Sequence, residues 1–528
     1  MQRFSSLPAS RRGALRATLA AALAGAAGLA PAACDNPVDV TNQNQPTATT
    51  FPANAADAQS AVFAAYNGLQ QRGMYQRWWA FDFDARSDIG TTTLSPWGDL
   101  ADFGKTVIRN PNFEVNIETY THAFNTIARA NQVIANVPNV QMDAATRDRY
   151  VAEAKFLRGL SYYHLTTLYG PNVPLILAPQ TVTDRPASSD SATMFAQIAT
   201  DFRDAAAVLP RQLSSSAGGR ATAGAAQGML GKALLQQRQW AAAAAALLPV
   251  INGNYGGYAL EPGAAGYARL FTAAANNNSP EVLFEVNMGS PATTASGVGG
   301  LNTLKMSGPC GPTYCDNRPT KWFQQQFTDR TTGGQPDPRL DATIFRYKGD
   351  TTMVYGRSWR WWRDSAKTAI GNDQNANYAD TARIYWKKYS EYYLGGTDQS
   401  WDANINFKVL RYADVLLMYA EALNEQGSSA QAAAYVNQVR ARVGLGPVSS
   451  ALTQAAMRQA VLAERVREFG FEAQRWPDLG RQNLFANLAE LKAHDPDFNF
   501  FEVPRSALLP IPLDETNQNP NVRQNTGY

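Results

Sequence analysis

Apolar residues recur at three- and four-residue steps in the segment 407–427, which predicts one face of an α-helix. The apolar positions are Val409, Ala413, Leu416, Ala420 and Leu423. Asp414, Glu421 and Glu425 fall outside this stripe, where we expect their charges to stay in water. Gly427 fits the position after a helix end, because only glycine takes the left-handed conformation there without a steric penalty. The pattern therefore predicts a helix that ends at this glycine.

The same helical period recurs through much of the chain and predicts a mostly α-helical protein. Further helices are expected at 57–70, 120–137, 146–169, 193–209, 222–250 (broken into a hairpin near 237–240), 428–443 and 453–481. Successive helix hairpins of this kind are typical of tetratricopeptide-like arrays, although their period here is ragged. The final segment 508–528 is rich in proline and asparagine, so we expect an extended tail without a helix.

The segment 252–406 has a different composition. Asparagine, glycine, proline, threonine and aromatic residues dominate, and helical periodicity is scarce. One short strand is expected at 281–286. Five of the eleven tryptophans fall between Trp359 and Trp401. These features predict a loop-rich lobe between an N-terminal helical part at 54–251 and a C-terminal helical part at 407–528.

The pattern of the first 53 residues indicates a targeting region. Arg11 and Arg12 precede a short Ala/Leu/Gly-rich run, which is typical of an export signal peptide at 1–33. Small residues then lead into Cys34, so we expect lipidation of this cysteine, with Pro31 an unusual residue at its lipobox position. Ordinary signal-peptidase cleavage and twin-arginine export remain alternatives. The polar segment 34–53 is expected to be a flexible tether.

The charge balance argues against nucleic acid as a partner. Removing the four arginines of residues 1–33 leaves 43 lysines and arginines against 44 acids, and charged residues make up only 17% of the chain. The three histidines are far apart in sequence, so we expect no metal site and no cofactor. His164 is expected to be a partly buried structural histidine. Cys310 and Cys315 enclose four residues and are expected to form a disulfide in an exported protein.

Several segments resemble those of the SusD/RagB family of surface-exposed, nutrient-binding lipoproteins, and they occur along the chain in the family's order. The most recognisable is Arg411-Tyr-Ala-Asp-Val-Leu-Leu-Met-Tyr-Ala-Glu-Ala-Leu-Asn424. Others are Ala128-Arg-Ala-Asn-Gln-Val133, Glu153-Ala-Lys-Phe-Leu-Arg-Gly-Leu-Ser-Tyr-Tyr163, Tyr169-Gly-Pro-Asn-Val-Pro-Leu175, Asp337-Pro-Arg339, Glu464-Arg-x-x-Glu468-Phe and the Asn-Thr-Gly-Tyr528 ending. The resemblance covers nearly the whole mature chain.

The resemblance implies a fold of four tetratricopeptide-like helix pairs with a loop-rich lobe packed against them. It also implies an outer-membrane lipoprotein that faces the exterior. Such a protein sits on a SusC-like TonB-dependent transporter and hands it oligosaccharides or other large nutrients. The family's ligand residues lie in variable loops, so no binding residue can be carried over to this sequence. Asp35 leaves sorting to the outer membrane open, because an aspartate after the lipidated cysteine retains some lipoproteins in the inner membrane.

Sugar sites combine aromatic platforms with a few planar hydrogen-bonding groups. Two stretches supply this mixture, namely 75–97 and 355–378. We therefore predict that the ligand-binding residues are Trp78, Trp97, Tyr355, Arg357, Trp359 and Trp361. The alternative for each tryptophan is packing inside the loop lobe or at a partner interface.

Two other functions remain as alternatives. A glycoside hydrolase needs two carboxylates in a cleft, and Asp82, Asp84 and Asp88 are the only plausible source. The charged stripe of Arg465, Glu468, Glu472 and Arg475 is instead interpreted as a structural, salt-bridged helix face. A helical-repeat scaffold that binds peptides or proteins is the second alternative.

Overall fold

The structure is a computed structural model that describes residues 51–92, 98–213, 218–289, 300–302, 306–309, 313–369, 380–393 and 403–528. Side chains are described in these ranges except at 365–369. The predicted signal peptide, Cys34 and most of the tether lie outside the described residues. Residues 52–528 form one compact unit.

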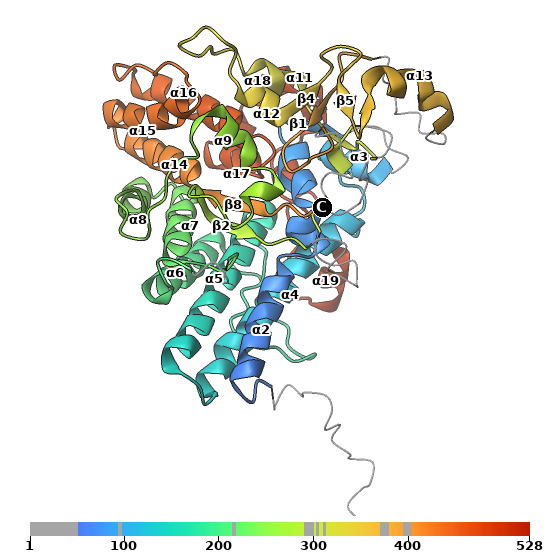
Figure 1. The fold of residues 1–528 in the computed structure, drawn as a ribbon. Coiled ribbons are helices and arrows are strands. Elements are labelled where there is room, and N and C mark those ends of the chain that lie inside the picture. Colours follow the sequence, from blue (N-terminus) through green and yellow to red (C-terminus); the bar gives the residue numbers. More distant parts are fainter. Residues whose placement is uncertain are drawn as a thin grey trace, which may run out of the picture. The chain divides into compact units, whose positions relative to one another are not determined.

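Most of the unit is helical, as the sequence predicted. The long helices are α2 (Ala55–Gly68), α4 (Glu114–Asn136), α5 (Ala144–Tyr169), α6 (Ser191–Val208), α7 (Ala223–Gln236), α8 (Trp240–Ile251), α14 (Tyr412–Glu425), α15 (Ser429–Arg442) and α16 (Gln454–Phe469). Each packs against the next one along this series, from α2 to α16. Figure 1 shows them side by side, rising from the lower centre to the upper left. This is the predicted array of helix hairpins.

Polar caps begin several of these helices where the sequence pattern begins. The side chains of Asp143, Asp190, Thr222 and Thr453 each accept a hydrogen bond from the backbone N–H three residues later. Such a bond satisfies one of the free donors of the first helical turn. A close crossing of α7 and α8 depends on Gly231, because a Cβ there would lie 2.4 Å from a methyl carbon of Leu247.

The loop lobe contains short antiparallel strand pairs. They are β1 (Gly90–Thr92) with β3 (Asn317–Pro319), β4 (Ile344–Arg346) with β7 (Ile384–Trp386), and β5 (Met353–Val354) with β6 (Arg357–Ser358). A fourth pair, β2 (Val282–Val286) with β8 (Phe407–Arg411), confirms the strand expected at 281–286. Figure 1 shows α13 (Trp359–Ala369) beside β5 at the upper right.

Shorter helical elements complete the described chain. The short α-helices are α3 (Gly98–Gly104), α9 (Gly263–Arg269), α11 (Lys321–Gln325), α12 (Arg339–Thr343), α17 (Arg475–Arg481), α18 (Leu488–His494) and α19 (Leu513–Gln518). Two π-helical segments lie at Arg72–Gln76 and Ala80–Ala85, and 3₁₀ turns at Val137–Asn139, Ala273–Ala275, Leu484–Ala486, Pro496–Phe500 and Arg505–Ala507. The short α19 contradicts the expectation of a tail without a helix.

Two predicted helix boundaries are wrong. Residues 407–411 form strand β8, and the helix α14 begins only at Tyr412. All five residues of β8 are buried, so its side chains on both faces contact protein and the helical period there is incidental. The predicted helix 453–481 is two helices, because α16 ends at Phe469. Phe471 and Ala473 have positive φ angles, which no α-helix accommodates.

Two of the three charges expected to stay in water are buried. Asp414 and Glu421 of α14 are each 2% exposed. Asp414 Oδ2 accepts from Lys232 Nζ at 2.7 Å, and its Oδ1 accepts from Arg465 Nη1 at 2.8 Å. Glu421 accepts two hydrogen bonds from Arg481, at 2.7 and 2.8 Å. Because the cations come from α7, α16 and α17, sequence periodicity within one helix does not reveal them.

Candidate functional site

The three aspartates considered for catalysis are each at most 1% exposed. Asp88 accepts from Arg475 Nε at 2.7 Å and from Arg475 Nη2 at 2.6 Å, and His494 Nδ1 lies 2.8 Å away. Burial alone would raise the pKa of Asp88, but Arg475 and His494 outweigh it and lower this pKa to about 2. Burial raises the pKa of Asp82 to about 7 and also raises that of Asp84. Because all three carboxylates are buried, they do not line a cleft that a polymeric substrate could enter.

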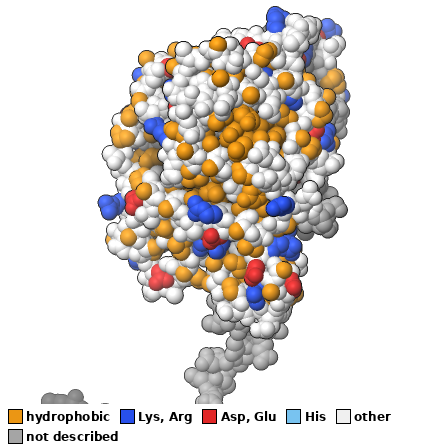
Figure 2. Space-filling model, turned by 90° about the vertical axis from the view of Figure 1, so that its left-hand side faces the viewer, with side chains coloured by type: hydrophobic (Ala, Val, Ile, Leu, Met, Phe, Trp, Pro, Cys, Tyr) orange, Lys and Arg blue, Asp and Glu red, His pale blue; other side chains and the backbone are white. Residues whose placement is uncertain are grey.

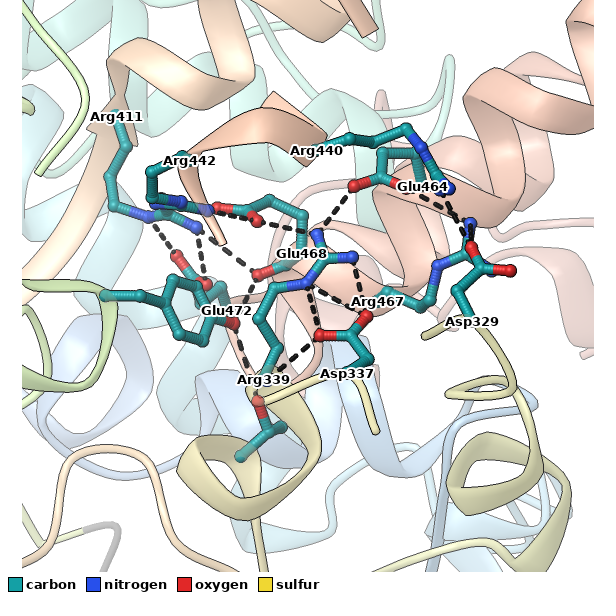
Figure 3. A network of polar contacts seen from close by, with 12 residues as sticks. Asp329, Asp337, Arg339, Arg411, Arg440, Arg442, Glu464, Arg467, Glu468 and Glu472 are labelled. Carbon is teal, nitrogen blue, oxygen red and sulfur yellow. Dashed lines mark hydrogen bonds and ion pairs between the residues drawn. The ribbon is translucent and has the colours of Figure 1, made fainter. Parts of the chain in front are cut away.

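Two acids of the predicted charged stripe, Glu468 on α16 and Glu472 beyond its end, belong to a larger buried network, most of which Figure 3 shows. Its cations are Arg339, Lys388, Arg411, Arg440, Arg442 and Arg467, and its acids are Glu281, Asp329, Asp337, Glu464, Glu468 and Glu472. Six positive charges therefore face six negative ones when all are ionised. The pairs join α12, β8, α15 and α16, elements from widely separated parts of the chain.

Glu468 lies at the centre of this network. Its carboxylate contacts Arg339 at 3.1 Å, Arg411 at 3.0 Å and Arg442 at 2.5 Å. Burial would raise the pKa of Glu468, but these three arginines lower it far below the ordinary range. A carboxylate held in its charged form cannot exchange protons near neutral pH, so it is unsuited to acid–base catalysis. The structural interpretation of the stripe is confirmed.

The expected partners within the stripe are wrong, however. Among the residues that the structure describes, Arg465, Glu468, Glu472 and Arg475 make no ion pair with one another; Arg465 pairs with Asp478 at 2.8 Å in addition to Asp414. Arg475 pairs with Asp88, which comes from the other end of the chain. The stripe therefore fastens distant elements together and does not stabilise one helix surface.

His164 is a structural histidine, as expected. Its Nε2 is hydrogen-bonded to the Tyr75 hydroxyl. Burial, together with the nearby charge of Lys232, lowers the pKa of His164 to about 3. The ring is therefore neutral at physiological pH. In the described part of the chain, no group of three or more His, Cys, Asp or Glu side chains is arranged to hold a metal ion.

Three of the six predicted ligand-binding residues are inside the protein. Trp78 and Trp359 are fully buried and Tyr355 is 2% exposed. Trp78 Nε1 donates to Glu118 Oε2 at 2.7 Å, so even its polar group faces the protein. These three side chains expose no surface to a ligand, and their assignment as direct contacts needs correction. Trp97 lies outside the described residues.

The other two predicted residues lie together at the surface of the lobe. Arg357 is exposed, Trp361 is half-buried, and the guanidinium carbon of Arg357 lies 5.0 Å from the centre of the Trp361 ring. We call this pair the Arg357–Trp361 platform. It combines an aromatic surface with a planar hydrogen-bond donor, which is what sugar sites use.

A separate aromatic core supports this platform. Its buried members are Cys315, Phe345, Val354, Tyr355, Trp359, Trp362, Tyr385 and Tyr392, and Trp361 packs against them. The rings of Trp361 and Trp362 are perpendicular, with centres 4.9 Å apart. Trp362 Nε1 donates to the Val354 carbonyl at 2.8 Å. Helical spacing distinguishes the tryptophans, because positions 359 and 362 share the inner face of α13.

Sequence reasoning missed Tyr314, which is 46% exposed beside the aromatic core. It precedes Cys315, which is fully buried and disulfide-bonded. Cys310 lies outside the described residues, so its pairing with Cys315 stays a prediction. The sequence contained one weak signal for Tyr314, namely its position inside the loop that the expected disulfide between Cys310 and Cys315 would close.

A cavity on other elements was also missed. Its volume is about 320 Å³. Polar side chains of the α6–α7 connection, of the segment before β2 and of β2 itself line much of it, including Arg211, Arg220, Tyr258, Asn277, Asn278 and Glu285. Arg220 already pairs with Glu153 at 2.7 Å, and Tyr258 lies 3.1 Å from Thr222 Oγ1. The cavity lining is therefore largely occupied by interactions within the protein.

A third surface is apolar. Helix α8 contains no charged residue, and Ala241, Ala242 and Ala245 are exposed. Figure 2 shows apolar side chains gathered in the middle of this face of the molecule, with charged side chains mostly towards its edges. Among the described helices, none is long and apolar enough to cross a membrane.

Comparisons with known proteins give a consistent result. The family model described as "SusD family" matches residues 280–528, and the model described as "Starch-binding associating with outer membrane" matches residues 39–235. SusD-like protein P2 of Formosa agariphila is 27% identical over 530 residues, covering 91% of this chain and 94% of that protein.

Solved structures agree with these matches. A laminarin-binding SusD-like protein is 26% identical with a TM-score of 0.71, covering 90% of this chain and 100% of that one. A SusD superfamily protein of Bacteroides vulgatus is 22% identical with a TM-score of 0.76, covering 91% of this chain and 100% of that one. At 22% identity, the match to the Bacteroides vulgatus protein supports the fold alone.

Proposed function

Because this chain belongs to the SusD family, we propose that it binds an extracellular glycan without catalysis and delivers it to a SusC-like TonB-dependent transporter. The observation that carries the proposal is the surface pair of Arg357 and Trp361 on a rigid aromatic support. The ring offers an apolar face to sugar C–H groups, and the guanidinium offers donors to sugar oxygens. The buried state of Asp82, Asp84 and Asp88 supports binding over hydrolysis.

Binding of soluble polysaccharides to the mature chain tests this proposal. Titration calorimetry with a panel of glycans should give saturable binding to at least one of them. Trp361→Ala should weaken that binding by about 1–3 kcal/mol, which is the range of one exposed aromatic contact. Trp240→Ala is the matched control, because Trp240 is also half-buried but lies on α8. Binding that survives Trp361→Ala unchanged would place the site elsewhere.

A folded chain that binds no glycan would favour the scaffold alternative, in which the helical array binds peptides or proteins. Product formation from any glycan would contradict the non-enzymatic proposal. Reducing-sugar release, measured on the same samples, separates binding from hydrolysis.

The proposed location depends on the N-terminal region. We expect lipidation of Cys34 after removal of residues 1–33, with the polar segment 34–53 as a tether to the outer membrane. Metabolic labelling with a fatty acid should mark the wild-type chain and not Cys34→Ser. Surface proteolysis of intact cells should then digest the labelled protein, and protection would indicate that it does not face the exterior.

A further inference from the structure

Positive charge is concentrated in the part of the chain that forms the aromatic lobe. The segment 313–393 contains thirteen lysines and arginines and nine aspartates and glutamates, a net charge of +4. The remainder of the chain after residue 34 has a net charge of −5, because the chain beyond the signal peptide totals −1. This segment therefore carries a net positive charge within a nearly neutral protein, a balance that favours anionic ligands near it.

Local pairing balances part of this charge around α13. The Asp350 carboxylate accepts from Arg363 Nη1 at 2.8 Å and from Arg360 Nε at 3.3 Å. Arg363 Nε also donates to Asp364 Oδ1 at 3.0 Å, so two acids face these two cations. The Asp341 carboxylate serves two cations, Arg346 at 3.0 Å and Lys348 at 2.7 Å, which leaves one positive charge in excess there.

Arg357 adds a charge without a counter-charge. Among the described residues, no ion pair joins its guanidinium to a carboxylate, whereas Arg360 and Arg363 both reach Asp350. Its contact is with the Trp361 ring, 5.0 Å from guanidinium carbon to ring centre. When a guanidinium lies over an aromatic face, its N–H groups point outward in the guanidinium plane, where a ligand oxygen can reach them.

Backbone geometry holds Arg357 in place. The β5–β6 hairpin pairs Val354 with Arg357, and its two central residues, Tyr355 and Gly356, have φ angles of 47° and 70°. Two successive positive φ angles are typical of a type I′ turn, the tight hairpin turn that matches strand twist. The buried ring of Trp359 anchors the next element two residues later. A preordered guanidinium loses less entropy when it binds.

We propose that the ligand of the Arg357–Trp361 platform is an anionic glycan, one that carries uronate carboxylates or sulfate esters. This inference rests on the proposed function of glycan binding and specifies the class of glycan. The planar guanidinium matches carboxylate and sulfate oxygens in a bidentate geometry. The Trp361 ring packs against the sugar ring that carries the anion.

Matched pairs of polysaccharides test the inference on the full mature chain. Polygalacturonate is compared with its carboxyl-reduced form, and dextran sulfate with dextran, by titration at low and high sodium chloride. We expect at least one charged polymer to bind about tenfold or more tightly than its neutral partner, with affinity falling as salt rises. The two pairs distinguish carboxylate from sulfate recognition.

Variants assign the selectivity to the platform. Arg357→Gln should weaken binding of the charged polymer by about three- to tenfold and should reduce any binding of the neutral polymer by a smaller factor. Arg203→Gln is the matched control, because Arg203 is exposed on α6 and has no ion pair among the residues that the structure describes. Its affinity should equal that of the wild type.

The outcomes separate the two proposals. Equal binding of charged and neutral polymers, insensitive to salt, would overturn the inference and leave glycan binding intact. Charged-polymer selectivity that Arg357→Gln does not reduce would overturn the assignment to this platform. A folded chain that binds neither these polymers nor any glycan of the wider panel would overturn the proposed function and the inference with it.

Discussion

Replacing Glu468 by glutamine tests whether the buried network holds the two helical parts and the lobe together. Glutamine preserves the size of the side chain and removes one negative charge. The network then has six positive and five negative charges in a region where Glu468, Arg339 and Arg411 are each at most 1% exposed. The glutamine amide also directs N–H groups at guanidinium N–H groups, which leaves donors without acceptors.

The expected cost is large because the site is dry. Breaking a buried ion pair on one side typically costs about 3–5 kcal/mol. The total stability of a folded protein is about 5–15 kcal/mol, so this single change should remove a substantial part of it. Glu425→Gln is the matched control, since the partner Arg458 is 33% exposed and Glu425 itself 10%, so water reaches their contact at 2.6 Å. An exposed pair is worth about 0–1 kcal/mol.

Urea unfolding at pH 7, followed by far-ultraviolet circular dichroism, measures both costs without adding salt. We expect Glu468→Gln to lower the free energy of unfolding by at least about 2 kcal/mol more than Glu425→Gln. Combining it with Arg442→Met restores the charge balance, so the double variant should cost less than the sum of the two single changes. Equal costs of the two glutamine variants, or full additivity in the double variant, would refute this account of the network.

Three further predictions follow from burial and packing. Trp359→Ala should destabilise the protein by about 3–5 kcal/mol in urea unfolding, whereas Trp361→Ala should cost clearly less and act on ligand affinity. Gly470→Ala should lower the melting temperature, because the new Cβ would lie 2.2 Å from the Phe323 ring; Gly98→Ala, with open space around it, is the control. Asp88 has its pKa lowered to about 2 from an unfolded value near 3.9, so it stabilises the fold above about pH 4 and less as pH falls towards 2. Urea unfolding measured between pH 7 and 2 should therefore show that the free energy of unfolding falls less steeply with decreasing pH in Asp88→Asn than in the wild type. Equal slopes would contradict the assignment of this pH dependence to Asp88.

The helical part of this fold was readable from the sequence because its causes are local. Apolar residues at helical spacing marked α2, α4 to α8, α14 and α15, and most of their ends lie within a few residues of the predicted ones; the exceptions are α4, which begins at Glu114 and not at 120, and α14, which begins at Tyr412 and not at 407. The break between α7 and α8 was also visible, since the pattern fails near residues 237–240. The repeated hairpins then followed, because amphipathic helices in sequence must bury their stripes against each other.

Among the predicted ligand-binding residues, the sequence named exposed and buried side chains of one stretch without separating them. The segment 355–361 contains both members of the Arg357–Trp361 platform together with two buried aromatics, Tyr355 and Trp359. Composition does not separate these, since a tryptophan is equally suited to a core and to a sugar platform. The period of α13 separates them only once the inner face of that helix is known.

The sequence by itself therefore determined the helix series and the family resemblance, and only the tertiary structure decided which charges and aromatics are buried. Asp414 illustrates the reason. From its own helix it reads as a solvated acid, yet Lys232 and Arg465 bring two positive charges to it from α7 and α16. Burial of a charge depends on partners that meet it in space, and spacing along one helix contains no information about residues about 50 and 180 positions away.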